Sequence, residues 1–221
     1  MEPMATKIAA DSVALENPKM VALVIVTSSG EQLTGELREV VFAHNLPINF
    51  VRSSSSLENS GAVVIHMDEK AIAFINTKIA FDCGADGVWL ISHSLPPEEF
   101  VKNSLEIKRL MPDKWIGLNI LHASKNEILK LFPKEMDGLW VDNIGLTDKS
   151  SAAAVMFMGE YYLKFKDKIL FGGVAFKHQP HVVNLVEMVR EARHVCDVIT
   201  TSGVKTGEPP TIEKMIIVHK E

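Results

Sequence analysis

The sequence predicts an α/β protein with a (β/α)8-type barrel, whose strand and helix units repeat from residue 61 to residue 219. Three segments, 84–91, 136–141 and 196–200, share one joint in which an amphipathic stretch ends, an aspartate follows and a short apolar run begins. An apolar run without alternation is typical of a strand buried on both faces, which favours parallel strands over hairpins. Strands that alternate with helices through short joints indicate a parallel α/β fold.

Six strands are predicted in this part of the chain, at 61–66, 87–93, 115–121, 138–143, 168–176 and 198–202. Helices are predicted at 68–81, from 97 onward, and at 124–131, 150–165 and 181–193. In the first helix, Ala71, Ile72, Ile75 and Ile79 form one apolar face. Together these elements make residues 61–221 the barrel core.

The first sixty residues are predicted to form a separate strand-helix-strand segment. A strand is expected at 21–26, an amphipathic helix at 31–43 and a short strand at 48–51, followed by a polar loop at 53–60. Two strands added to six make eight, so this segment can complete the barrel. The polar loop leaves no room for a crossover helix, and the alternative is an open or incomplete barrel.

Composition narrows the class of protein. The net charge of -5 and the pI of about 5.9 exclude an overall positive potential that would attract the backbone of a nucleic acid. Cys83 and Cys196 are interpreted as small buried apolar residues in a reducing compartment. No apolar run reaches the roughly 18 residues of a membrane span, and no secretory signal is recognisable, so a cytoplasmic location is expected. A homo-oligomer is compatible with the sequence, and the sequence leaves open which cofactor, if any, the protein binds.

Polar residues stand at six consecutive strand ends. In a barrel of parallel strands these ends converge on one face, which makes them candidates for a functional site. Any one of them alone can equally be a loop residue with a satisfied hydrogen bond. The candidates are His66, Asp68, His93, Asn119, Asp142, Asn143, Lys177, His178, Thr201, Ser202 and Gly203.

The residue types suggest roles. Asp142 can act as a general base or bind ribose hydroxyls, and Lys177 can neutralise a phosphate or polarise a carbonyl. We assign catalytic roles to Asp142, His178, Lys177 and His66, and substrate binding to His93, Asn119 and Asn143. No metal is predicted, although His66, Asp68, His93 and Asp142 are also possible metal ligands.

The segment 200–211 is predicted to bind phosphate. Small residues directly after a strand let backbone N–H groups face a ligand, and a helix that starts near Thr211 adds its positive end. The phosphate-binding candidates are Thr201, Ser202, Gly203, Lys205, Thr206 and Gly207. The alternative is a tight turn that Thr211 caps.

Several of these segments together resemble predicted TIM-barrel proteins related to the BtpA/SgcQ family. They are 84–88, 115–119, 139–143, 171–177 and 201–207, and the last matches a Ser-Gly-x-x-Thr-Gly pattern at Ser202, Gly203, Thr206 and Gly207. The resemblance covers about residues 61–219 and implies an aldolase-type or ribulose-phosphate-binding barrel. Relatives of this kind continue with further strands after the last helix, and residues 1–60 match nothing in the family.

The sequence therefore leaves two functions open. The first is an enzyme, phosphoribosyltransferase-like or nucleosidase-like, that acts on a small phosphorylated metabolite with a ribosyl-phosphate or nucleotide-like part. The second is a BtpA-like binding or complex-assembly factor without turnover. Polar strand ends favour the enzyme, whereas the unusual ends of the chain favour the assembly factor.

Overall fold

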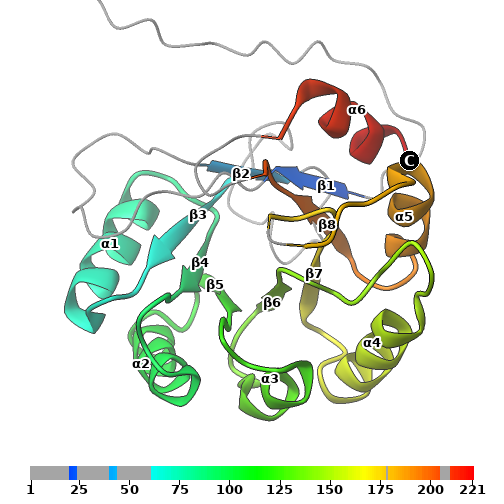
Figure 1. Ribbon diagram of the computed structural model, residues 1–221. Coiled ribbons are helices and arrows are strands. Elements are labelled where there is room, and N and C mark those ends of the chain that lie inside the picture. Colours follow the sequence, from blue (N-terminus) through cyan, green and yellow to red (C-terminus); the bar gives the residue numbers. More distant parts are fainter. Residues whose placement is uncertain (1–19, 24–39, 44–60, 178, 205–209) are drawn as a thin grey trace, which may run out of the picture.

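The computed structural model describes residues 20–23, 40–43, 61–177, 179–204 and 210–221. Six parallel strands alternate with helices that lie outside them (Figure 1). The strands are β3 (Gly61–His66), β4 (Gly87–Ile91), β5 (Trp115–Asn119), β6 (Gly138–Val141), β7 (Ile169–Gly173) and β8 (Val198–Thr201). The helices are α1 (Lys70–Asp82), α2 (Pro97–Leu110), α3 (Lys125–Leu131), α4 (Ala152–Lys164), α5 (Leu185–Ala192) and α6 (Ile212–Lys220). The six predicted strand and helix units are confirmed. None of the helices described is long and apolar enough to cross a membrane.

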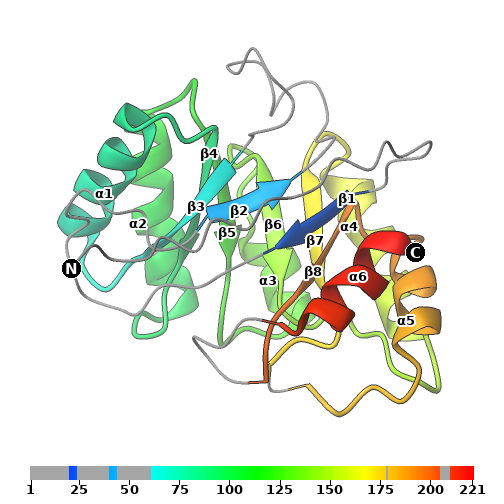
Figure 2. The ribbon, with the colours of Figure 1, turned by 90° about the horizontal axis from the view of Figure 1, so that it is seen from above.

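Two short strands close the ring of hydrogen bonds. β1 (Met20–Leu23) pairs in parallel with β8, and β2 (Val40–Ala43) pairs antiparallel with both β1 and β3. β1 and β2 lie side by side in both views (Figures 1 and 2). Because β2 runs against all the other strands, the ring differs from eight equal strand and helix repeats.

The prediction of a helix at 31–43 is wrong at its carboxyl end, since Val40–Ala43 forms β2. Val40, Val41 and Phe42 are β-branched or aromatic residues that favour strands, and β2 has a pairing partner on each side. The predicted strand at 21–26 overlaps β1. Residues 31–39 and the predicted strand at 48–51 lie outside the described residues.

Each of the six parallel strands β3–β8 separates two apolar layers. One cluster of buried residues comes from the strands and the loop after β7, without any helix, and therefore fills the barrel interior: Ala62, Val64, Trp89, Ile91, Trp115, Trp140, Ile169, Phe171, Phe176 and Val198. The alternate strand residues join the helices in a second, outer cluster. Trp89 sits centrally, with ring centroids 5.0 Å from Trp115, 5.8 Å from Trp140 and 4.6 Å from Phe171. Gly117 makes room for this ring, because a Cβ there would lie 2.4 Å from Cζ3 of Trp89. The described strands thus line the interior with mostly large apolar side chains, as expected of a small barrel.

The most apolar face of α1 is not its buried face, and the predicted burial of Cys83 is wrong. Ile72 and Ile75 of α1 are 41% and 44% exposed, whereas the helix buries Ala73, Asn76, Thr77, Ala80 and Phe81. Mostly small side chains on the buried face let the helix approach the strands closely. Cys83, which directly follows the last residue of α1, is exposed. Cys196 is buried, as predicted.

Two aspartates of the repeated joint, Asp137 and Asp197, connect neighbouring strands. Oδ2 of Asp137 accepts the backbone N–H of Ile116 at 2.8 Å and the ammonium of Lys108 at 2.7 Å. Oδ2 of Asp197 accepts the backbone N–H of Leu170 at 2.8 Å in the same way. Each of these carboxylates therefore binds the second residue of the strand alongside.

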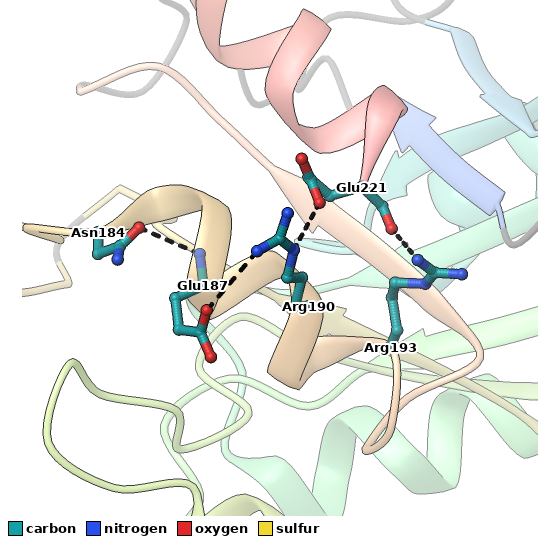
Figure 3. Close-up of polar contacts among 5 residues, drawn as sticks. All are labelled: Asn184, Glu187, Arg190, Arg193 and Glu221. Carbon is teal, nitrogen blue, oxygen red and sulfur yellow. Dashed lines mark hydrogen bonds and ion pairs between the residues drawn. The ribbon is translucent and has the colours of Figure 1, made fainter.

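α6 lies beside α5, and polar contacts fix the pair (Figure 3). Nε of Arg190 donates to Oε2 of Glu221 at 2.7 Å, and Arg193 donates to the carbonyl oxygen of the same residue. Asn184 caps α5, since its Oδ1 accepts the N–H of Glu187 at 3.2 Å.

Candidate functional site

The predicted site residues stand where the parallel strands end. His66 and Asn119 are the last residues of β3 and β5, Asp142 directly follows β6, and Ser202 directly follows β8. The carboxyl ends of parallel strands meet on the same face of a barrel. We call this face of the barrel the rim. The contacts of the predicted site residues lie there.

Asp142 is held by the last residue of β5 and by a residue of the loop after β7. Nδ2 of Asn119, a buried side chain, donates to Oδ1 of Asp142 at 2.8 Å. Nε2 of Gln179 donates to the carbonyl oxygens of Asp142 at 2.5 Å and Gly173 at 3.2 Å. The N–H of Phe176 in turn donates to Oε1 of Gln179 at 3.2 Å, which sets the orientation of the amide. The carboxylate of Asp142 therefore has a defined direction.

Two histidines from neighbouring strands form a stacked pair. The ring centroids of His66 and His93 are 5.3 Å apart, and the planes differ by 19°. Next to them, Oγ of Ser94 donates to Oδ1 of Asp68 at 2.9 Å, which connects the loop after β4 to the loop after β3. Oγ of Ser92 accepts the N–H of Leu95 at 3.0 Å and so shapes the turn that carries His93.

The electrostatic surroundings of His93 connect four further residues to this place. Partial removal from water lowers the pKa of His93 below its ordinary value of 6.5, and the charges of Lys177 and His122 lower it further. The carboxylates of Asp142 and Asp68 act in the opposite direction. These residues come from the loops after β3, β5, β6 and β7, so side chains from distant parts of the chain act on one ring.

This shift predicts a pH dependence with a definite sign. The unfolded chain takes up a proton at His93 near pH 6.5, whereas the folded ring resists protonation until a lower pH. We therefore expect the free energy of unfolding to decrease as the pH falls from about 6.5 toward the lower pKa of the folded state. In this pH range the unfolded chain binds a proton at His93 and the folded protein does not. An NMR titration should show the pKa of His93 raised in Lys177→Met and lowered in Asp142→Asn. Identical titrations in these two variants would contradict the placement, and the signal of His194, beyond α5, is the internal control.

The loops after β7 and β8 are joined at Lys177. Its backbone N–H donates to Oγ of Ser202 at 2.7 Å, and its Nζ lies 6.0 Å from the ring centroid of Phe176. Thr201 and Ser202 are buried, and Gly203 is half-buried. Lys205, Thr206, Gly207 and His178 lie outside the described residues, so most of the predicted phosphate segment stays a prediction.

Lys214 of α6 is a part of the rim that the sequence did not indicate. Its Nζ donates to the carbonyl oxygens of Ala175 at 2.5 Å and Ser202 at 2.6 Å. Burial lowers the pKa of this ammonium below its ordinary value. Thr211 caps the same helix as predicted, because its Oγ1 accepts the N–H of Lys214 at 3.2 Å. The lysine side chain therefore ties α6 to the loops after β7 and β8.

Asn143 and the possible metal ligands fit less closely into this arrangement. The side chain of Asn143 is exposed, and its Oδ1 accepts the N–H of Gly145 at 2.9 Å within its own turn. Within the part of the chain that the structure describes, no group of three or more His, Cys, Asp or Glu side chains is placed to hold a metal ion. The rim is accordingly a set of carboxylate, imidazole and ammonium groups around His93.

Comparison with known proteins gives distant likenesses in structure alone. No protein-family model and no curated protein matches the chain. Among solved structures it is similar to two muconate cycloisomerase variants, each with a TM-score of 0.48 and 10% identity, over 72% of this chain and 43% of the other. It is also similar to DHDPS from Cyanidioschyzon merolae with lysine bound, with a TM-score of 0.44 and 12% identity, over 72% of this chain and 50% of that one. The chain thus spans half or less of these proteins.

Proposed function

We propose that the rim is the active site of an enzyme that acts on a small phosphorylated metabolite with a ribosyl-phosphate or nucleotide-like part. The proposal is carried by the common action of Lys177, Asp142 and Asp68 on the ring of His93, because these groups come from four different strand ends. Acidic, basic and titratable groups that converge in this way are typical of catalytic sites.

Each group has a chemical role in the proposal. Asp142, oriented by Asn119, accepts a proton from a substrate hydroxyl or binds the hydroxyls of a ribose. Lys177 supplies a positive charge for the phosphate oxygens. His93 has a lowered pKa, which favours the neutral imidazole at pH 7, the form that accepts a proton. His66 lies against it and completes the proton-transferring pair.

The proposal extends to the predictions that the described residues do not test. We retain membership of the BtpA/SgcQ family, with a phosphoribosyltransferase-like or nucleosidase-like reaction, and a cytoplasmic location. Residues 1–60 would complete the barrel, and a homo-oligomer remains part of the proposal. In the proposal, His178 is a further catalytic residue, and Lys205, Thr206 and Gly207 bind the phosphate.

Binding of ribose 5-phosphate tests the proposal. In a thermal-shift experiment this ligand should stabilise the protein, by about 2.7 kcal/mol at a concentration of 100 times Kd, and free ribose should stabilise it less. Lys177→Ala should lose most of the stabilisation, because the variant lacks the ammonium that faces the phosphate. Inorganic phosphate and nucleoside monophosphates extend the same screen.

Lys166→Ala is the matched control. It removes the same charge from an exposed lysine in the turn between α4 and β7, at the opposite end of the barrel, and should keep the full ligand shift. The proposal fails if no phosphorylated ligand stabilises the wild-type protein, or if Lys177→Ala and Lys166→Ala respond equally.

A further inference from the structure

Three polar groups inside the barrel lack a hydrogen-bond partner. They are Nε1 of Trp89, Nε1 of Trp140 and Oγ1 of Thr200, and no described residue bonds to any of them. The three side chains are at most 1% exposed. Nearly all buried donors and acceptors in folded proteins have a partner, either in the protein or in bound water, because an unpaired one costs about 1–3 kcal/mol.

All three groups face the barrel interior. Trp89 and Trp140 belong to the interior cluster, and the centroids of their rings are 5.8 Å apart. Along β8, Val198 lies in the interior cluster and Ile199 in the outer one, so alternation turns Thr200 inward again.

The strand register places Thr200 at the level of the rim. Thr200 pairs with Gly173, and Gly172 pairs with Val141, so Thr200 stands at the level of Asp142. At Gly173 the backbone of Asp142 occupies the place of a side chain, because the carbonyl oxygen of Asp142 lies 1.9 Å from the Cβ position. Trp140 is one inward position below Asp142 on β6.

The edge of Trp89 that carries its N–H is not the edge that packs on glycine. The atoms nearest to the Cβ position of Gly117 are Cζ3 and Cε3, on the side of the indole opposite Nε1. The N–H is therefore directed away from this contact, toward other parts of the interior.

The unpaired groups define the chemistry of an occupant. An indole N–H only donates, whereas a threonine hydroxyl both donates and accepts. We propose that the interior below the rim is a binding site for hydrogen-bond-accepting oxygen atoms, held by the indoles of Trp89 and Trp140 and the hydroxyl of Thr200. The oxygen comes either from ordered water or from a phosphate, carboxylate or carbonyl group of a ligand that enters through the rim. Binding of water is independent of the function proposed above. Binding of a ligand oxygen rests on the proposed function, because the ligand would be the substrate.

NMR of the indole N–H groups separates these two sources. The chain has three tryptophans, so a 15N-labelled sample gives three indole signals, which single Trp→Phe variants assign. In the absence of ligand, cross-relaxation between water and the indole protons of Trp89 and Trp140 identifies bound water. If ribose 5-phosphate abolishes this cross-relaxation and shifts both signals, a ligand oxygen replaces the water. If ribose 5-phosphate leaves the signals unchanged, the water is a permanent part of the site, and the proposal holds even though the rim does not bind this ligand.

Thr200→Val gives an independent readout, because it removes the hydroxyl and keeps the shape of the side chain. If the hydroxyl of Thr200 binds an oxygen atom, Thr200→Val should have a lower Tm than the wild type, by about 2–4 °C for each kcal/mol of unfolding free energy that is lost. Thr77→Val is the matched control: Thr77 is equally buried and unpartnered among the described residues, but it belongs to α1 outside the strands, and its loss should not lower Tm.

Two results would overturn the proposal. One is the absence of water contact and of a ligand shift at both indoles, which would leave the N–H groups against the aromatic faces around them. The other is a Thr200→Val protein at least as stable as the wild type.

Discussion

Replacement of Asp137 by alanine is expected to lower the free energy of unfolding by about 3 kcal/mol. The carboxylate accepts the N–H of Ile116 and the ammonium of Lys108, which is only 8% exposed. Without it, a strand loses a backbone acceptor and a buried positive charge loses its counterion, and both losses carry a desolvation penalty. Urea denaturation followed by circular dichroism measures the change.

Asp82→Ala is the control for this prediction. It breaks another lysine–aspartate pair, Lys78–Asp82, but both side chains of that pair are 63% exposed, so the expected cost is below about 0.5 kcal/mol. Adding Lys108→Met to Asp137→Ala should recover part of the loss, because the unpaired charge is then absent as well. Equal stabilities for Asp137→Ala and Asp82→Ala would show that the buried joint does not hold the strands together.

The joint also explains why the fold was predictable from the sequence. An aspartate before an apolar run marks the start of β6 and β8, and in the structure its carboxylate binds the strand alongside. The signal is local, and so is the buried, unalternating run that follows it. All six parallel strands were therefore placed correctly, and the observed strands end at most three residues earlier than predicted.

Contacts between distant segments could not be predicted in this way. Gln179 binds the carbonyl of Asp142 across 37 residues, and Lys214 binds that of Ala175 across 39. Neither lies at a strand end, so neither carried the pattern that pointed to Asp142 and Lys177. The strand β2 was missed for a related reason, since its pairing partners lie in β1 and β3 and its residues also fit a helical period.

The rotation of α1 shows the limit of hydrophobic periodicity. The isoleucines form the more apolar face, yet the structure exposes Ile72 and Ile75 and buries Ala73 and Thr77. A face of small residues lets the helix lie closer to the strands, and close contact along the whole helix can outweigh the burial of a few larger side chains. Hydrophobicity alone does not record this difference in fit.

Gly173→Ala should disrupt the rim. A Cβ at this position would lie 1.9 Å from the carbonyl oxygen of Asp142 and 2.5 Å from its carbonyl carbon. Both atoms belong to the backbone, so no side-chain rotation can relieve the overlap. β6 and β7 must separate, which breaks the double contact of Gln179 and displaces the carboxylate of Asp142.

We expect Gly173→Ala to cost about 3 kcal/mol of unfolding free energy, at the upper end of the range for overpacked sites, and to abolish stabilisation by ribose 5-phosphate. Gly159→Ala adds the same methyl group in the middle of α4, where nothing lies within 4 Å, and should stabilise the protein by about 0.5–1 kcal/mol through helix propensity. Opposite signs from the same chemical change would show that the narrow approach of β6 to β7 positions Asp142. A Gly173→Ala protein as stable as Gly159→Ala would mean that the two strands can separate freely and that their close approach does not position Asp142.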